Sequence, residues 1–220
     1  MEKHVVVIYP HPDDESFGAA GTMTQFREQG VPVTYLCGTL GEMGRNMGTP
    51  TFANRETLPE IRKQELIDAC KALDIELRML GYRDKTLEYE DRGEVAAHLK
   101  GILQEIKPSL VITHYPDHAV HPDHNALGAA AIEAVRLMDP ADRPTVWAQA
   151  LTEEIDGKVR ERDIVNDVTA QFDTKLQAIL AHKSQASPML GLMNTEDKET
   201  IEAVKDRFNT ESFFIWKYDD

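Results

Sequence analysis

Two clusters of histidine and carboxylate residues stand out in this sequence. The first, HPDDE (His11–Glu15), directly follows the apolar run VVVIY, and the second, HPDH (His121–His124), follows the apolar run in SLVITHY. Carboxylates crowded at the end of a buried strand repel one another and retain water, so they are tolerated there when a cation lies among them. Each cluster therefore indicates a site for a divalent metal ion.

Each cluster alone also has a simpler interpretation. Asp13 or Asp14 could cap a helix by accepting its free amide hydrogens, and Pro122 with Asp123 could form an acidic first turn. The two clusters together favour the metal site, because the carboxyl ends of parallel strands meet at one edge of a sheet. A dinucleotide site is disfavoured, because carboxylates stand where glycine amides would face a pyrophosphate.

The elements that would position the clusters alternate between strand and helix. Apolar runs predict strands at residues 5–9, 33–38, 77–80, 109–115, 146–151 and 163–168, with a closing edge strand at 211–218. Helical spacing predicts helices at 18–29, 58–73, 94–106, 122–138, 174–182 and 195–208, and a long glycine-rich loop covers 38–56. This alternation implies right-handed crossovers and a Rossmann-like α/β fold, with a mostly parallel sheet and helices on both faces.

Composition limits the classes of function. The chain has 220 residues, 41% of them hydrophobic, with 24 Lys and Arg against 38 Asp and Glu and a net charge of -14. Such a charge argues against nucleic acid and anionic membranes as partners. No apolar run approaches the roughly 20 residues of a membrane span. Cys37 and Cys70 fit no metal or redox spacing, so we expect a reduced, cytoplasmic protein.

Beyond this chemistry, the motifs resemble those of the PIG-L/LmbE-like family of zinc-dependent N-acetylglucosaminyl deacetylases. PHPDDE and HPDH carry the resemblance, supported by TLGEMG, IRKQELIDACKAL, LGYRDKTL and KLQAILAHKSQ. The detail is closest to the deacetylases of bacillithiol biosynthesis, which act on N-acetylglucosaminyl malate. The resemblance covers nearly the whole chain and implies a single deacetylase domain over residues 1–220.

Carried over by position, the resemblance implies His11, Asp14 and His124 as zinc ligands and Asp13 as the general base. Two imidazoles and one carboxylate leave an open position for water, whose pKa zinc lowers to about 7. The same donors also suit Fe²⁺ or Co²⁺. The expected reaction is attack of a zinc-bound water on the amide of an N-acetyl group.

The resemblance also implies supporting residues. His121 would stabilise the developing negative charge or supply a proton at the other side of the reaction centre, and Asp123 would orient it. Arg62 and Asp84 would line the substrate site. His121 could instead close the coordination sphere as a fourth ligand, which would make the protein a metal-binding domain without turnover.

The predicted partner is a small acetylated glucosamine conjugate, most specifically N-acetylglucosaminyl malate. The malate end is doubly anionic, and the cations expected near the sheet edge are Arg45, Arg55, Arg62 and Arg83. The alternative substrate is another small N-acetylated sugar or amide, as in detoxification. Families of this kind often form homo-oligomers, which the sequence neither requires nor excludes.

Overall fold

The computed structural model describes residues 2–155, 157–186, 192 and 197–218, and one seven-stranded sheet runs through this part of the chain. In spatial order the strands are β3 (Glu76–Met79), β2 (Val33–Cys37), β1 (Val5–Tyr9), β4 (Leu110–His114), β5 (Thr145–Gln149), β9 (Thr210–Ile215) and β8 (Ile164–Asp167). The first five run parallel, and β9 is antiparallel to both its neighbours. The mostly parallel α/β architecture is thus confirmed.

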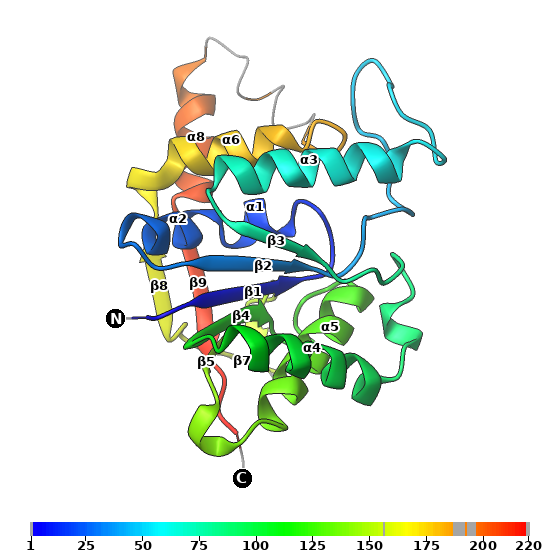
Figure 1. The fold of residues 1–220 in the computed structure, drawn as a ribbon. Coiled ribbons are helices and arrows are strands. Elements are labelled where there is room, and N and C mark those ends of the chain that lie inside the picture. The colour runs from blue at the N-terminus through cyan, green and yellow to red at the C-terminus, as the bar shows by residue number, and fades with distance from the viewer. Residues whose placement is uncertain (1, 156, 187–191, 193–196, 219–220) are drawn as a thin grey trace.

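Helices cover both faces of the sheet (Figure 1). Side chains of β1 point alternately to the two faces, so Val5, Val7 and Tyr9 pack in one core and Val6 and Ile8 in the other. All five are completely buried, which explains the unbroken apolar run. One face carries α1 (Asp14–Gly18), α2 (Ala20–Glu28), α3 (Leu58–Ala72) and α6 (Phe172–Ala181), and the other carries α4 (Arg92–Ile106) and α5 (Pro122–Arg136).

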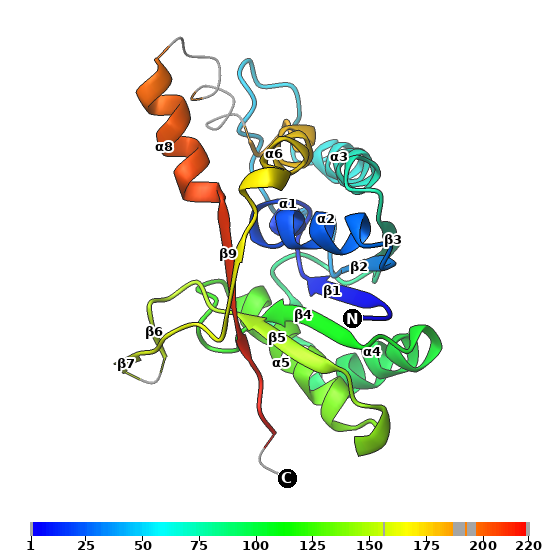
Figure 2. The ribbon, with the colours of Figure 1, turned by 90° about the vertical axis from the view of Figure 1, so that its left-hand side faces the viewer.

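The last strand differs from the prediction. Residues 211–218 were expected at an edge, but β9 lies inside the sheet between β5 and β8, and Figure 2 shows it running beside β5. Phe213 and Phe214 are both buried, so β9 has an apolar residue for each face, as an internal strand requires. The edge prediction was therefore wrong. The predicted helix at 18–29 corresponds to α2, and the short helix α1 before it was not predicted.

The smaller elements complete the described chain. They are α8 (Lys198–Phe208), the 3₁₀ helices η1 (Leu87–Tyr89), η2 (Pro140–Asp142) and η3 (Thr169–Gln171), and the hairpin of β6 (Glu154–Ile155) with β7 (Lys158–Val159). Residues 195 and 196 of the predicted helix at 195–208 lie outside the described residues. Among the described helices, none is long and apolar enough to cross a membrane. Both cysteines are free and buried.

The strand order places the two motif clusters together. From β1 the chain passes to β2 on one side, whereas β4 pairs with β1 on the other side. The loops after β1 and β4 therefore leave the same edge of the sheet at the point where the order reverses, which is where open α/β sheets bind ligands.

Candidate metal centre and active site

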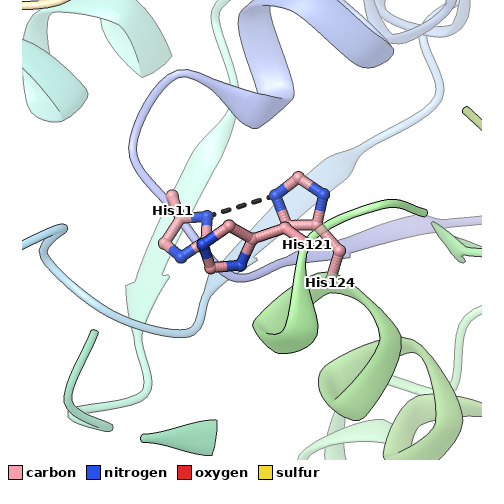
Figure 3. A group of neighbouring side chains, drawn as sticks. All are labelled: His11, His121 and His124. Atoms are coloured by element: carbon pink, nitrogen blue, oxygen red, sulfur yellow. Dashed lines mark hydrogen bonds between the residues drawn. The ribbon is translucent and has the colours of Figure 1, made fainter. Parts of the chain in front are cut away.

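The loops after β1 and β4 bring the three predicted metal ligands together. The Nδ1 atom of His11 lies 3.2 Å from Nε2 of His124 and 3.4 Å from Oδ2 of Asp14. The Oδ1 atom of Asp14 lies 3.2 Å from Nε2 of His124. Figure 3 shows the rings of His11, His121 and His124 gathered between the β1 loop and the start of α5. The three donor atoms are close enough to bind one divalent ion.

Hydrogen bonds at the far side of each ring indicate which nitrogen is free. Nε2 of His11 lies 3.2 Å from Oδ2 of Asp123 and 3.3 Å from Oδ1 of Asp84, so it holds its proton between two carboxylates. Nδ1 of His124 lies 3.2 Å from the carbonyl oxygen of Ala119, which can only accept. Both rings therefore present a lone pair to the shared point, and this donor set fits a metal ion with the outer hydrogen bonds that metal-bound histidines make.

The electrostatics of the centre also favour a cation. Burial disfavours the charged form of Asp14, but His124 and His11 hold its pKa well below the usual value. Burial alone would lower the pKa of His11, yet hydrogen bonds to Asp123, Asp14 and Asp84 raise it well above the usual value. The carboxylates thus stabilise positive charge at the point where the donor atoms meet.

Two further histidines stand beside these ligands. His121 with His11 and His124, and His114 with Asp14 and His124, also form groups whose donor atoms lie within 4.8 Å of one another. The ring of His114 stacks on that of His124, with centroids 4.1 Å apart and an interplanar angle of 5°. Burial lowers the pKa of His114 to about 3, so its ring is neutral and supports His124 by packing.

Asp13 does not serve as a helix cap. It stands at the N-cap position of α1, but its side chain accepts no capping hydrogen bond and its backbone has a positive φ of 110°. Its Oδ2 atom instead lies 3.2 Å from Nη2 of Arg62. Burial raises the pKa of Asp13 to about 7, against the opposing charge of Arg62. A carboxylate with such a pKa suits proton transfer near neutral pH.

Arg62 reaches the site from α3 through a gap that glycine provides. Its Nη1 donates to the carbonyl oxygen of Gly41 at 3.0 Å, and its Nη2 also donates to the carbonyl oxygen of Pro12. Gly41 has a φ of +64°, and a Cβ there would lie 1.9 Å from Nη1. The loop after β2 therefore needs a residue without a side chain at position 41, so that Arg62 can reach Asp13.

His121 does cap its helix. Its Nδ1 accepts the backbone N–H of Asp123 at 3.1 Å, so the remaining nitrogen, Nε2, carries the proton of a neutral ring. Burial, followed by the nearby His11 and His124, lowers the pKa of His121. This contact occupies Nδ1 and leaves Nε2–H as a hydrogen-bond donor.

The two supporting aspartates both contact His11. The carboxylate of Asp123 was expected to orient His121, but its Oδ2 contacts Nε2 of His11 and accepts the backbone N–H of Lys85 at 2.7 Å. Only the backbone N–H of Asp123 bonds with His121. Asp84 likewise supports His11, and its other oxygen accepts the N–H of Met43 at 2.8 Å. Both side chains stabilise a predicted metal ligand from behind.

A pocket of about 160 Å³ opens over these groups, lined by His11, Asp13, Gly44, Arg62, Asp84, Lys85 and His121. A second hollow of about 430 Å³ contains Arg55 and Arg83, together with the neighbouring Glu42, Met43 and Tyr82. Of the four arginines expected near the sheet edge, Arg62 thus lines the pocket and Arg55 and Arg83 line the hollow beside its loops. Arg45 lines neither.

Sequence reasoning missed a group of buried charges around Asp13. Glu15, Glu65 and His182 are all buried, and Glu15 contacts both His182 and the backbone of Asp13. No local pattern marks them as buried, because Glu15 lies between Asp14 and Ser16 and His182 is followed by Lys183. Their partners are remote in sequence, so the sequence did not identify the contacts.

Comparison with known proteins agrees with this geometry. Residues 6–135 match the PIG-L family, described as GlcNAc-PI de-N-acetylase. The chain is 50% identical over 220 residues to the probable N-acetyl-alpha-D-glucosaminyl L-malate deacetylase 2 of Bacillus cereus, and both chains are covered completely. It is 48% identical over 221 residues to the protein of the same name from Bacillus subtilis (strain 168), again over the whole of both chains.

Solved structures show the same fold. The N,N'-diacetylchitobiose deacetylase from Pyrococcus horikoshii, complexed with its inhibitor MPG, has a TM-score of 0.74 and 27% identity, covering 98% of this chain and 84% of that one. A 4-carboxy-2-hydroxymuconate hydratase has the same TM-score of 0.74 at 17% identity, covering 99% and 98%, so the fold alone does not define the reaction. With its family match over more than half its length and these full-length relatives, the chain belongs to the PIG-L family.

Proposed function

We propose that this protein is a metal-dependent deacetylase that hydrolyses the N-acetyl group of N-acetylglucosaminyl malate, as in bacillithiol biosynthesis. The observation that carries the proposal is the meeting of three metal donor atoms with Asp13 and His121 in one pocket. Asp13 is not needed to hold a metal, so a binding domain without turnover would have no use for it. Full-length similarity to proteins named as malate deacetylases supports the substrate.

We propose Zn²⁺ as the metal, held by Nδ1 of His11, the carboxylate of Asp14 and Nε2 of His124. A divalent ion there supplies a Lewis acid for the amide carbonyl and lowers the pKa of water to about 7. Fe²⁺ and Co²⁺ suit the same donors, so metal analysis of the purified protein identifies the ion.

Asp13 is the group that moves the proton. Arg62 occupies its Oδ2, which leaves Oδ1 to accept the proton of the attacking water. Its raised pKa then allows it to pass that proton to the leaving amine. His121 is unsuited to that step, because its Nδ1 accepts a backbone hydrogen bond and its ring is neutral.

His121 has a different part in the reaction. The side chain of His121 lines the pocket, and its Nε2–H would donate to the carbonyl oxygen as negative charge develops there. A neutral donor can do this without taking up a proton, so the helix cap at Nδ1 remains intact during the reaction.

The malate end of the substrate requires positive charge outside the acidic centre. Arg55 and Arg83 line the neighbouring hollow, and among the described residues neither guanidinium has an ion pair or hydrogen-bond partner. Lys85 adds a third cation at the rim of the pocket. We propose that these side chains bind the two carboxylates of malate.

Acetate release from N-acetylglucosaminyl malate tests the proposal, measured before chelation, after chelation and after zinc is restored. We expect release that chelation abolishes and zinc restores, and slower release from N-acetylglucosamine, which lacks the malate. If the protein releases acetate only from other acetylated sugars or amides, one of these is the substrate in place of N-acetylglucosaminyl malate. If the protein holds one zinc ion tightly but releases no acetate from any of these compounds, a metal-binding domain without turnover is favoured.

A further inference from the structure

A buried carboxylate–imidazole pair lies next to the active site without lining its pocket. Glu15 in α1 and His182 at the end of α6 are both completely buried, and Oε1 of Glu15 lies 2.6 Å from Nε2 of His182. The hydroxyl of Ser16 donates to the same oxygen at 2.6 Å. Burying such a pair is costly unless every polar atom finds a partner, and the buried Nδ1 of His182 has none among the described residues, so the pair calls for a reason.

The second oxygen of Glu15 supplies that reason. Its Oε2 accepts the backbone N–H of Asp13 at 3.0 Å. Asp13 has a φ of 110°, a conformation that costs a residue other than glycine about 1–3 kcal/mol and persists only when its surroundings enforce it. Glu15 holds the backbone of this strained residue, and Arg62 holds its carboxylate at 3.2 Å.

The segment that carries His182 is itself fixed to α3. Glu65 accepts the backbone N–H of Ser184 at 2.7 Å and the Ser184 hydroxyl at 2.6 Å. Glu65 lies three residues after Arg62, on the same side of α3. One helix therefore anchors Asp13 in two ways, directly through Arg62 and indirectly through Ser184, His182 and Glu15.

We infer that Glu15 and His182 are positioning residues that hold the strained backbone of Asp13, so that its carboxylate points at the metal pocket. The inference rests on the proposed function, because it assumes that Asp13 transfers the proton. It gives a role to the HKSQ segment after α6, none of whose side chains lines the pocket. The rival explanation is that the pair only joins α1 to α6.

The experiment measures kcat and KM of the zinc-loaded protein, zinc affinity by calorimetry and thermal unfolding for a set of variants. His182→Ala removes the bond to Glu15, and we expect kcat to fall about 10- to 100-fold, since a misplacement of about 1 Å costs on that order. We expect KM and zinc affinity to change less than about threefold. His182→Gln should recover most of the loss, because its amide can donate to Glu15.

A double-mutant cycle separates positioning from general packing. If His182 acts through Asp13, the double variant Asp13→Ala/His182→Ala should have the kcat of Asp13→Ala alone. The matched control is His4→Gln, which removes an imidazole whose Nε2 lies 2.9 Å from the Thr34 hydroxyl at the far end of β1. It should leave kcat unchanged. Should His182→Ala fail to fold, Glu15→Gln replaces it in the cycle, because one oxygen then becomes a donor.

Two results would overturn the inference alone. One is an unchanged kcat in folded His182→Ala, and the other is a double variant that falls below Asp13→Ala by the full factor seen for His182→Ala. A wild-type protein that binds zinc but releases no acetate from N-acetylglucosaminyl malate would instead overturn the proposed function, and the role of Asp13 with it.

Discussion

Replacing Asp123 by asparagine tests how the carboxylates support the metal centre. The carboxylate is completely buried, its Oδ2 contacts Nε2–H of His11 at 3.2 Å, and its Oδ1 has no hydrogen-bond partner among the described residues. Asparagine keeps the shape and can still accept one bond, but it removes the negative charge that orients His11 and makes its Nδ1 more basic. Loss of such an outer partner typically weakens metal binding 10- to 100-fold. We therefore expect the free energy of zinc binding to weaken by about 1.4–2.8 kcal/mol, at 1.4 kcal/mol per tenfold.

The assay is competition for zinc between the protein and a chromophoric chelator, followed by kcat at saturating zinc. Asp84→Asn is the matched control, because Asp84 contacts the same nitrogen at 3.3 Å but is also held by the N–H of Met43. Its effect should be smaller, since Asp123 remains. Unchanged zinc affinity in Asp123→Asn, with a loss confined to kcat, would refute this reasoning and restore the expectation that Asp123 serves His121.

Three further predictions concern the rest of the site. Reversing the charge at Arg55 or Arg83 should raise KM for N-acetylglucosaminyl malate roughly tenfold, since each lost charge-assisted bond contributes about 1.5 kcal/mol or more. The KM for N-acetylglucosamine should not change, and an equal change in KM for both substrates would contradict the malate assignment. Gly41→Ala should lower kcat at least about tenfold by displacing the buried guanidinium of Arg62. Gly30 also has a positive φ, +77°, but open space around it, so Gly30→Ala should lower stability and leave kcat unchanged. Burial would lower the pKa of His182, but neighbouring carboxylates raise it. The stability that His182 adds over His182→Gln is therefore complete below about pH 6.5 and declines as pH rises through the folded-state pKa. Urea unfolding should show a smaller difference in unfolding free energy between the two proteins at pH 9 than at pH 6.

The sequence predicted those parts of the fold and site that local pattern controls. The strand Val5–Tyr9 and the positions of His11 and His124 follow from apolar runs and from the rule that parallel strands end at one edge. The internal position of β9 could not be predicted, because strand order in space is set by tertiary packing. The short helix α1 at Asp14–Gly18 was not predicted, because the HPDDE cluster was interpreted as the loop after the first strand.

The contacts of buried charges were beyond the sequence for a related reason. The partner of Glu15 is 167 residues away and that of Glu65 is 119 residues away, so neither pairing leaves a local trace. For Asp123, the neighbouring His121 was the natural candidate, but the first turn of α5 directs the carboxylate across to His11. A motif thus located the residue while the fold decided which histidine it serves.

The two sets of supporting contacts come from different elements, so mutations in one set should affect a different property from mutations in the other. Asp84 and Asp123 support His11 from the loop after β3 and the first turn of α5. Glu15, Arg62 and His182 hold Asp13 from α1, α3 and the end of α6. Because the two sets share no side chain, metal binding and proton transfer should be separable by mutation. Variants of the first set should lose zinc and recover turnover when zinc is raised, and variants of the second should keep zinc and lose turnover that no amount of metal restores.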